Sequence, residues 1–345
     1  MTTIFVAGYK ELAGKTTICV ALGKVLQANG IKTDYIRVSD AVEGEGLQNA
    51  TLDQEFVSTA ISSTSGTSSG LPIVLKDSTE NIKEAVSAAT QDSSAVTLVE
   101  LPGTSEQSTA ASILPITHEL SAQLLVVVKY HQKLTGQELA DLLGTAKQRV
   151  AGIILNSLPR KQFSRISEAL ASSFEEVGFK VIATLPEDRA LYGFTIGEMA
   201  AELGGQFICH PEMADKLIEH VMLGANAADP AYTYFSPRPN KAVFCRSDRP
   251  DIQLAALDTE TRCLVLTGSG HYQQNLVYRA EDLGVAVLRV NNDTYSTIID
   301  LNKVFPKVRF RHVDKVARAV GLLSEATDIP RLIQLVSSSS ISPSS

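Results

Sequence analysis

The run Gly8-Tyr-Lys-Glu-Leu-Ala-Gly14-Lys15-Thr16-Thr17 decides the fold of this chain. It follows the apolar run Ile4–Ala7 and opens an amphipathic segment over Ile18–Gln27, so a strand, a glycine-rich turn and a helix follow one another. Glycines let backbone N–H groups turn inward around a phosphate, and the N-terminus of the helix adds partial positive charge. The pattern therefore favours a phosphate-binding loop over a plain glycine turn.

Five loop residues are the candidate contacts of a nucleotide: Gly8, Gly14, Lys15, Thr16 and Thr17. Lys15 would reach the β and γ phosphate oxygens, and the Thr16 hydroxyl would ligate Mg²⁺. The spacing is unusual because five residues separate Gly8 from Gly14. The chain is expected to bind a nucleotide, and turnover of that nucleotide is a separate question.

Length and composition limit the remaining possibilities. A chain of 345 residues has room for two domains that each bury a core. The formal charge of −7 argues against a general nucleic-acid binder. No apolar run approaches the roughly 20 residues of a membrane span. The 4 cysteines show no metal-binding spacing, which predicts reduced, buried thiols. With no room for a signal peptide before the first strand, we expect a cytoplasmic protein, and a plastid stroma or other reducing lumen stays open.

Residues 1–222 alternate apolar, strand-like runs with helical patterns, which indicates a parallel sheet covered on both faces. A Ser/Thr/Gly-rich segment, Ser58–Gly70, is expected to form a mobile loop, either a lid or a plain surface excursion. The predicted strands are Thr3–Ala7, Thr33–Arg37, Ala95–Val99, Leu124–Val128, Val150–Leu155 and Val181–Leu185, and two predicted helices are Gly136–Gln148 and Phe163–Val177.

A composition shift at Gly224–Pro230 predicts a domain boundary, followed by a smaller α/β domain over 223–330. The serine-rich end, 331–345, cannot bury surface and is expected to be a disordered tail. The strands predicted for the second domain are Lys241–Cys245, Cys263–Thr267, Val285–Val290 and Val308–Arg311, and its predicted helices include Asp251–Asp258 and Asn275–Leu283.

A Mg²⁺–nucleotide site needs further oxygen ligands, commonly at the end of a second apolar strand. Glu100 ends such a run, Val96-Thr-Leu-Val-Glu100, and is the first candidate for a direct or water-bridged contact, with a structural or capping role as the alternative. Asp53 is a weaker candidate. Asn156, just past a predicted strand, would contact a base edge or be an ordinary turn residue.

The first 220 or so residues resemble the dethiobiotin-synthetase-like ATPases, and more closely the P-loop domain at the N-terminus of long phosphotransacetylases. The matching features are the long loop, Leu98-Val-Glu100-x-Pro-Gly103, Gly152-Ile-Ile-Leu-Asn156, Leu185-Pro-Glu-Asp-Arg-Ala-Leu191 and Thr195-Ile-Gly-Glu198. The resemblance implies ATP and Mg²⁺ as ligands. It also implies that Thr16, Asp53 and Glu100 hold the metal, and that Asn156, Pro186 and Glu187 lie near the base.

The chain departs from the synthetases at two points. Their substrate-binding Lys-Pro pair is replaced by Arg37-Val38, and the turn after the strand is Glu100-Leu-Pro-Gly103 rather than a glycine-rich one. Both departures argue against dethiobiotin or amide-ligase chemistry.

The second domain resembles a DRTGG domain, the module that follows the P-loop domain in long phosphotransacetylases. The similar residues are Asn240-Lys-Ala-Val, Ser247 to Leu257, Cys263 to Gly268 and Asp293-Thr294, although the name-giving motif keeps only Asp248-Arg249. The candidate ligand contacts at the strand ends are Asp248, Arg249, Thr267 and Asp293. Helix capping and a helix-start salt bridge are the alternative roles.

The transacetylase catalytic domain is not part of this sequence, so acetyl transfer is not expected without a separate subunit. The first hypothesis is an ATP/Mg²⁺-binding regulatory or assembly protein, non-catalytic or a slow ATPase, that couples nucleotide state to a protein partner and forms a homo-oligomer. The second is an ATP-dependent ligase or kinase of the dethiobiotin synthetase type, acting on an unknown small acid. A weaker third is a ParA-like positioning ATPase, which would carry a lysine where this chain has Tyr9.

Overall fold

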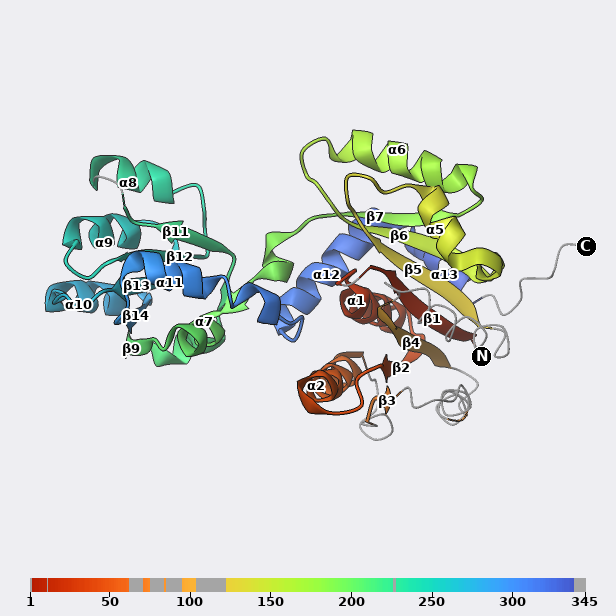
Figure 1. Cartoon of the computed structure of the whole chain (residues 1–345), viewed down its shortest axis with the longest axis horizontal. Coiled ribbons are helices and arrows are strands. Elements are labelled where there is room, and N and C mark those ends of the chain that lie inside the picture. Colours follow the sequence, from red (N-terminus) through yellow and green to blue (C-terminus); the bar gives the residue numbers. More distant parts are fainter. Residues whose placement is uncertain are drawn as a thin grey trace, which may run out of the picture. The chain divides into compact units, whose positions relative to one another are not determined.

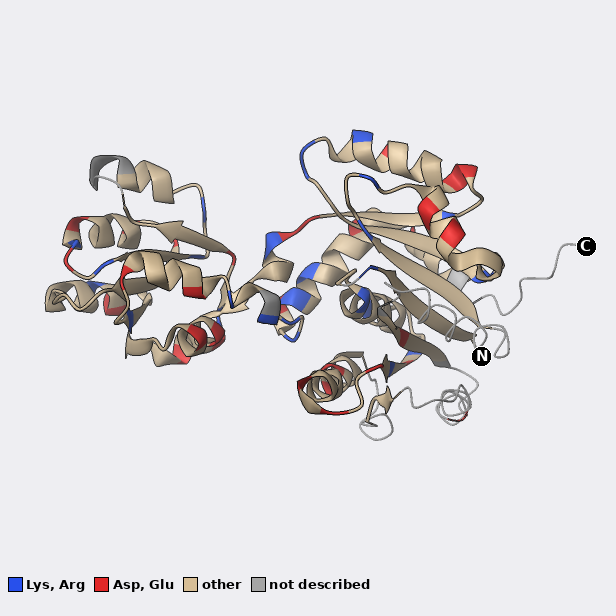
Figure 2. Cartoon of the chain, in the orientation of Figure 1, with Lys and Arg blue, Asp and Glu red and all other residues tan. Residues whose placement is uncertain are grey.

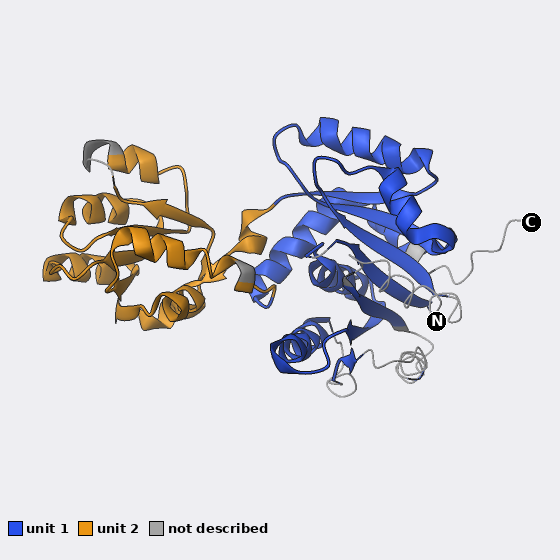
Figure 3. Cartoon of the chain, in the orientation of Figure 1, with its two compact units in different colours: residues 1–187, 311–345 blue, residues 188–310 orange. Residues whose placement is uncertain are grey.

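The computed structural model describes residues 2–10, 12–61, 71–74, 84, 95–103, 122–225 and 228–337. The chain forms two compact units (Figure 3). Unit 1 comprises Met1–Glu187 together with Arg311–Ser345, and unit 2 comprises Asp188–Phe310. The chain therefore leaves unit 1, builds unit 2 and then returns to complete unit 1.

Unit 1 is built on a seven-stranded sheet in the order β3-β2-β4-β1-β5-β6-β7, in which every strand pair is parallel. Its strands are β1 (Thr2–Tyr9), β2 (Lys32–Ser39), β3 (Ile73–Val74), β4 (Ala95–Gly103), β5 (Gln123–Lys129), β6 (Val150–Leu158) and β7 (Val181–Pro186). All but the last residue of β5 are buried, as expected for a strand covered on both faces.

Helices cover both faces of this sheet (Figure 1). They are α1 (Lys15–Ala28), α2 (Gly44–Ile61), α5 (Gly136–Leu143), α6 (Phe163–Glu176), α12 (Val313–Ala326) and α13 (Ile329–Ser337), with a 3₁₀ turn η1 (Gly144–Arg149) after α5. The α5 and α6 side chains share one apolar core with β1, β5 and β6. On the other face α1 contacts α2 and α12, and a Cβ on Gly23 would lie only 2.8 Å from Ile61 Cγ2. Glycine is therefore needed where α1 meets α2.

Unit 2 holds a five-stranded sheet in the order β11-β12-β13-β14-β9, parallel except that β9 runs antiparallel to β14. Apolar clusters lie on both of its faces. Its strands are β8 (Phe194–Thr195), β9 (Gln206–Cys209), β10 (Leu217–Ile218), β11 (His220–Leu223), β12 (Lys241–Arg246), β13 (Thr261–Thr267) and β14 (Ala286–Val290). Its helices are α7 (Ile196–Leu203), α8 (Ala228–Phe235), α9 (Pro250–Leu257), α10 (Gln274–Leu283) and α11 (Thr294–Leu301), with 3₁₀ turns η2 (Arg189–Tyr192), η3 (Pro211–Asp215) and η4 (Phe305–Lys307).

The predicted fold class is confirmed, but the limits of the two units differ from the predicted 1–222 and 223–330. The shift at Gly224–Pro230 lies inside unit 2, because the Gly224 N–H continues the β11–β12 pairing by donating to Phe244 O at 2.7 Å. At the other end, α12 belongs to unit 1 and not to the second unit. Of the predicted tail, 331–337 lie in α13, and 338–345 fall outside the described residues.

Two further local predictions concern Val308–Arg311 and Ser58–Gly70. The strand predicted at Val308–Arg311 is wrong, since these residues form an irregular connection into α12. The alternating Val-Arg-Phe-Arg pattern fits a strand, yet β14 already has β13 and β9 as neighbours. Of the predicted loop Ser58–Gly70, the first four residues complete α2, and 62–70 lie outside the described residues.

The distribution of charged residues and the state of the cysteines can be compared with what the composition predicts. Acidic and basic residues are interspersed over the elements of both units (Figure 2). All four cysteines are free and buried, as predicted. Among the helices that the structure describes, none has both the length and the apolar character that crossing a membrane requires.

Candidate functional site

The loop between β1 and α1 has an unusual backbone. Lys10, Leu12 and Gly14 adopt positive φ values of 68°, 52° and 93°. Residues other than glycine rarely adopt this conformation. Where it recurs in a turn, successive backbone N–H groups can point inward and form a concavity that binds an anion. The α1 helix starts at Lys15 with no side-chain cap and no acidic residue in its first turn, so its first N–H groups face no competing carboxylate from that turn.

Lys15 folds back over the start of the loop. A Cβ on Gly8 would lie 2.9 Å from Lys15 Cδ and 3.1 Å from Ala13 Cβ, so glycine leaves room for the lysine stem. Burial lowers the pKa of Lys15, and the Glu100 carboxylate opposes that shift. Burial disfavours the charged form of the Lys15 ammonium group, and a phosphate beside it would stabilise that form.

Asn156, at the carboxyl end of β6, holds the loop from the side. Its Nδ2 donates to Ala13 O at 2.8 Å, and a Cβ on Gly14 would lie 2.4 Å from the same nitrogen. Its Oδ1 accepts from Ser157 N at 2.9 Å. The side chain predicted to touch a base edge is thus engaged with the loop, and a base contact from Asn156 stays a prediction.

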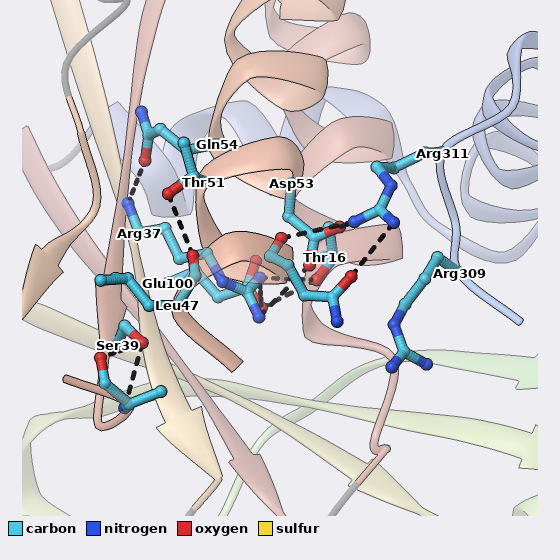
Figure 4. A network of polar contacts seen from close by, with 12 residues as sticks. Thr16, Arg37, Ser39, Leu47, Thr51, Asp53, Gln54, Glu100, Arg309 and Arg311 are labelled. Atoms are coloured by element: carbon cyan, nitrogen blue, oxygen red, sulfur yellow. Dashed lines mark hydrogen bonds and ion pairs between the residues drawn. The ribbon is translucent and has the colours of Figure 1, made fainter. Parts of the chain in front are cut away.

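Thr16 and Glu100, which sequence reasoning placed at one metal ion, lie in direct contact (Figure 4). Thr16 Oγ1 donates to Glu100 Oε1 at 2.8 Å, and the carboxylate is only 2% exposed. Arg37 joins both, because its Nη1 lies 2.9 Å from Glu100 Oε1 and 3.2 Å from Thr16 Oγ1. Tyr35 donates its hydroxyl to the other oxygen of Glu100 at 2.7 Å. The buried carboxylate therefore has three different donors.

Asp53, the third predicted metal ligand, lies on the far side of Arg37 (Figure 4). Its Oδ2 is 3.5 Å from Arg37 Nη2, and its Oδ1 accepts from Arg311 Nη1 at 2.9 Å. Burial raises the pKa of Asp53, while the two arginines oppose that shift. Arg311 also donates to the backbone oxygen and side-chain oxygen of Asn49. The predicted trio is thus assembled around Arg37, and Arg311 binds only its Asp53 member.

Gln54 fixes the backbone that carries Arg37. Its Oε1 accepts from Arg37 N at 2.6 Å, and its Nε2 donates to Tyr35 O at 3.0 Å and to Ser58 Oγ at 3.0 Å. Because the Gln54 amide is 3% exposed and bonds both β2 residues, α2 determines where the end of β2 lies.

The remaining unit 1 candidates occupy the same edge of the sheet. Thr17 lies in the first turn of α1. Pro186 ends β7 opposite Leu158, and Glu187 N donates to Leu158 O at 2.7 Å, extending the β6–β7 pairing. The carboxyl ends of parallel strands are where ligands bind in open α/β sheets. Contact of these residues with a nucleotide stays a prediction.

The unit 2 candidates are each engaged within the unit. Asp248 pairs with Arg246, and Arg249 pairs with Asp251 at 2.7 Å between Nη2 and Oδ2. Thr267 Oγ1 lies 2.6 Å from Thr294 Oγ1 and donates to Cys245 O at 3.2 Å.

Asp293 caps α11 by accepting from Ser296 N at 3.0 Å. Capping and a helix-start salt bridge, the alternative roles considered for these residues, are therefore present, and ligand contact stays a prediction.

The trio of predicted metal ligands does not fit Mg²⁺ in this arrangement. A hydroxyl and two carboxylates are suitable oxygen ligands. The Arg37 N–H groups, however, occupy the space between all three. Among the described residues, no group of three or more His, Cys, Asp and Glu side chains is arranged to hold a metal ion.

Sequence reasoning noted Arg37 as a departure from a family pattern and as part of the acceptor entry in the ligase or kinase alternative, and it missed Arg311, Tyr35, Asn49 and Gln54. Tyr35 lies two residues before Arg37, so both side chains lie on the same face of a predicted strand that ends at the ligand edge. That spacing could have predicted that Tyr35 belongs to the site. Arg311 pairs with a residue 258 positions earlier, and no local pattern reveals such a contact.

Comparison with known proteins agrees with this architecture. A family model for the AAA domain matches residues 2–193, and one for the DRTGG domain matches 198–304. The MinD cell division protein of Aquifex aeolicus is 18% identical over 55% of this chain and 84% of its own, with a TM-score of 0.38. The signal recognition particle receptor FtsY of Elizabethkingia anophelis is 13% identical over 54% of this chain and 59% of its own, with a TM-score of 0.37.

A third structure holds the CBS and DRTGG domains of the regulatory region of Clostridium perfringens pyrophosphatase, complexed with its activator diadenosine tetraphosphate. It is 13% identical over 43% of this chain and 73% of its own, with a TM-score of 0.30. Likenesses as weak as these three say nothing about ligand, partner or activity. The AAA domain model covers more than half of the chain, so this protein belongs to the AAA domain family and consists of a P-loop NTPase-type domain followed by a DRTGG domain.

Proposed function

We propose that this protein is an ATP-binding regulatory or assembly protein, non-catalytic or a slow ATPase, that couples nucleotide state to a partner protein. One observation carries the proposal. The Gly14–Lys15 turn meets the Thr16–Glu100 pair, and from there a chain of contacts runs through Arg37 and Asp53 to Arg311. Arg311 is the first residue after unit 2, so a change at the loop has a physical route to the connection that leaves unit 2.

The nucleotide part of the proposal rests on the loop. The positive φ at Gly14, the Lys15 stem lying over Gly8 and the uncapped start of α1 together supply N–H donors and a cation for phosphate oxygens. Pro186 and Glu187 lie at the same sheet edge, and we assign them to the adenine ring.

The coupling part rests on α2. Asp53 and Asn49 both lie on this helix and both accept from Arg311, while Asp53 also faces Arg37. Phosphates that attract Arg37 would weaken the ion pair between Arg37 and Asp53. The ion pair between Asp53 and Arg311 would change as a result. Such control requires that nucleotide affinity differ between two states of the contact.

Calorimetric titration with ATP tests the binding. The wild type should bind, Lys15→Ala should lose at least about tenfold in affinity, and Lys24→Ala, on the same helix, should match the wild type. No heat of binding for the wild type would refute the proposal.

Pull-down from native lysate, with and without ATP, tests the coupling. One partner should be recovered in a nucleotide-dependent way by the wild type, and Arg311→Ala should recover it equally in both conditions. Light scattering with and without ATP tests homo-oligomerisation in the same samples. Nucleotide-independent recovery by the wild type would leave only a scaffold, and metabolite-stimulated release of ADP would favour the ligase or kinase alternative.

A further inference from the structure

The Arg37 guanidinium takes the place that a metal ion would have at this site (Figure 4). The Thr16 hydroxyl donates its one proton to Glu100 Oε1 at 2.8 Å and accepts from Arg37 Nη1 at 3.2 Å. A threonine that ligates Mg²⁺ uses that same oxygen lone pair for the metal. Guanidinium and metal therefore compete for one position.

The charges of the site are balanced without a metal. Glu100 is 2% exposed, and a buried carboxylate requires a paired cation. Burial alone would lower the pKa of Arg37, but the neighbouring Glu100, Tyr35 and Asp53 outweigh it and hold that pKa above the ordinary value, so the cation is permanent. The three cations Lys15, Arg37 and Arg311 face the carboxylates of Glu100 and Asp53, and Asp40 also acts on Lys15, so the charges of the side chains offset one another.

Arg37 is also held firmly. Its backbone N–H donates to Gln54 Oε1 at 2.6 Å, and its side chain spans from Glu100 to Asp53. Moving the guanidinium out would leave the buried Glu100 carboxylate with the hydroxyls of Thr16 and Tyr35 as its hydrogen-bond donors among the described residues. A divalent ion could enter only at the cost of this rearrangement.

We infer that Arg37 of β2 occupies the position of the metal ion beside the loop and that the chain binds a nucleoside triphosphate in its metal-free form. This inference rests on the proposed function and deepens it, because it names the chemical form of the ligand. Arginine matches phosphate oxygens with a fork of N–H donors, so it can contact the polyphosphate while keeping its bond to Glu100.

The test is calorimetric titration of the full chain with ATP, once in EDTA and once in excess Mg²⁺. The wild type should bind in EDTA with an affinity within about threefold of that in Mg²⁺. Arg37→Ala should lose at least about tenfold in EDTA and bind better in Mg²⁺ than in EDTA. Arg37→Lys keeps the positive charge but lacks the forked pair of N–H donors. Its affinity for ATP in EDTA should lie between those of the wild type and Arg37→Ala.

Folding is controlled separately. Arg37→Ala leaves Glu100 without its cation, so the double variant Arg37→Ala/Glu100→Gln is measured beside it, with circular dichroism for both. The double variant should also bind more weakly in EDTA than the wild type. Wild-type binding that vanishes in EDTA and returns with Mg²⁺ would overturn the inference while leaving the proposed function intact, whereas no binding in either buffer would overturn both.

Discussion

Lys241, the first residue of β12, is an unusual buried cation. Its relative exposure is 0%, and its Nζ has no hydrogen-bond partner among the described residues. Burial lowers the pKa of Lys241 to about 8, and the Glu260 carboxylate offsets only part of that shift. The folded chain therefore binds this proton more weakly than the unfolded chain, whose lysines titrate near their ordinary value of about 10.4.

We predict that Lys241→Met stabilises the protein at pH 7 by an amount on the order of 3 kcal/mol. Between pH values of about 8 and about 10 the unfolded state binds more protons, so the wild-type free energy of unfolding should rise with pH in that window. Urea unfolding of both proteins across the window measures the difference, and Lys303→Met, at an exposed lysine, is the control. Parallel pH profiles for wild type and Lys241→Met would contradict the assignment.

Gly14 is the loop residue with the least freedom. We predict that Gly14→Ala costs about 1 to 2 kcal/mol, because alanine resists a φ of 93° and its Cβ would lie 2.4 Å from Asn156 Nδ2. ATP affinity should fall at least about tenfold as the Asn156–Ala13 bond is displaced.

Gly30→Ala is the matched control for Gly14→Ala. Gly30 has a φ of 77°, but its Cβ would meet nothing within 4 Å. Urea unfolding should therefore show a loss in this variant too, while titration with ATP gives the wild-type affinity. Equal loss of affinity in both variants would refute the role of Asn156.

Among single residues, sequence reasoning predicted the contacts that follow from recognisable motifs. Thr16 and Glu100 meet because a loop and a strand end converge at one edge of a parallel sheet, which the spacing of apolar runs already indicates. Asp53 came only through resemblance to a family. The pairing of Asp53 with Arg311 depends on the chain returning from unit 2, and nothing local in either stretch encodes that return.

At the scale of elements, α12 matters most to unit 1. It packs against α1 and β7, burying Ala319, Leu322 and Leu323. We predict that a chain ending at Phe310 loses at least about 4 kcal/mol of stability in unit 1, since each leucine contributes roughly 2 kcal/mol on burial. Thermal unfolding followed by circular dichroism measures this loss.

A chain ending at Ser337, which keeps α12 and α13, is the control for that truncation. It should unfold at the wild-type temperature. Equal unfolding temperatures for the two truncated chains would show that α12 adds nothing to unit 1.

Elements with a strong period were predictable, and elements defined by long-range packing were not. The strands β1, β5 and β6 followed from continuous apolar runs flanked by helical patterns. The α12 helix has its buried residues at helical spacing, yet the alternating Val308–Arg311 run before it favoured a strand. A strand needs a partner edge, and the order of strands in the sheet is not written in any single segment.

At the scale of the whole molecule, unit 2 is an insertion in unit 1. Residues 188–310 hold their own sheet and apolar cores, whereas residues 1–187 lack α12. We predict that 188–310 expressed alone unfolds cooperatively and that 1–187 alone does not. Because α12 contacts β7, a short linker from Glu187 to Arg311 should restore cooperative unfolding of unit 1. Calorimetric unfolding of the three chains decides, and a cooperative 1–187 would count against the insertion.

The burial of every thiol has a practical consequence for following the two units. Cys19 lies in α1 of unit 1, and Cys209, Cys245 and Cys263 lie in unit 2. An alkylating reagent can reach each sulfur only when its unit opens. In a mass spectrum, opening of unit 1 would add one label and opening of unit 2 would add three. The number of labels therefore reports separately on the opening of each unit in the native chain. Bound ATP should slow the addition of the single label at Cys19 more than that of the other three.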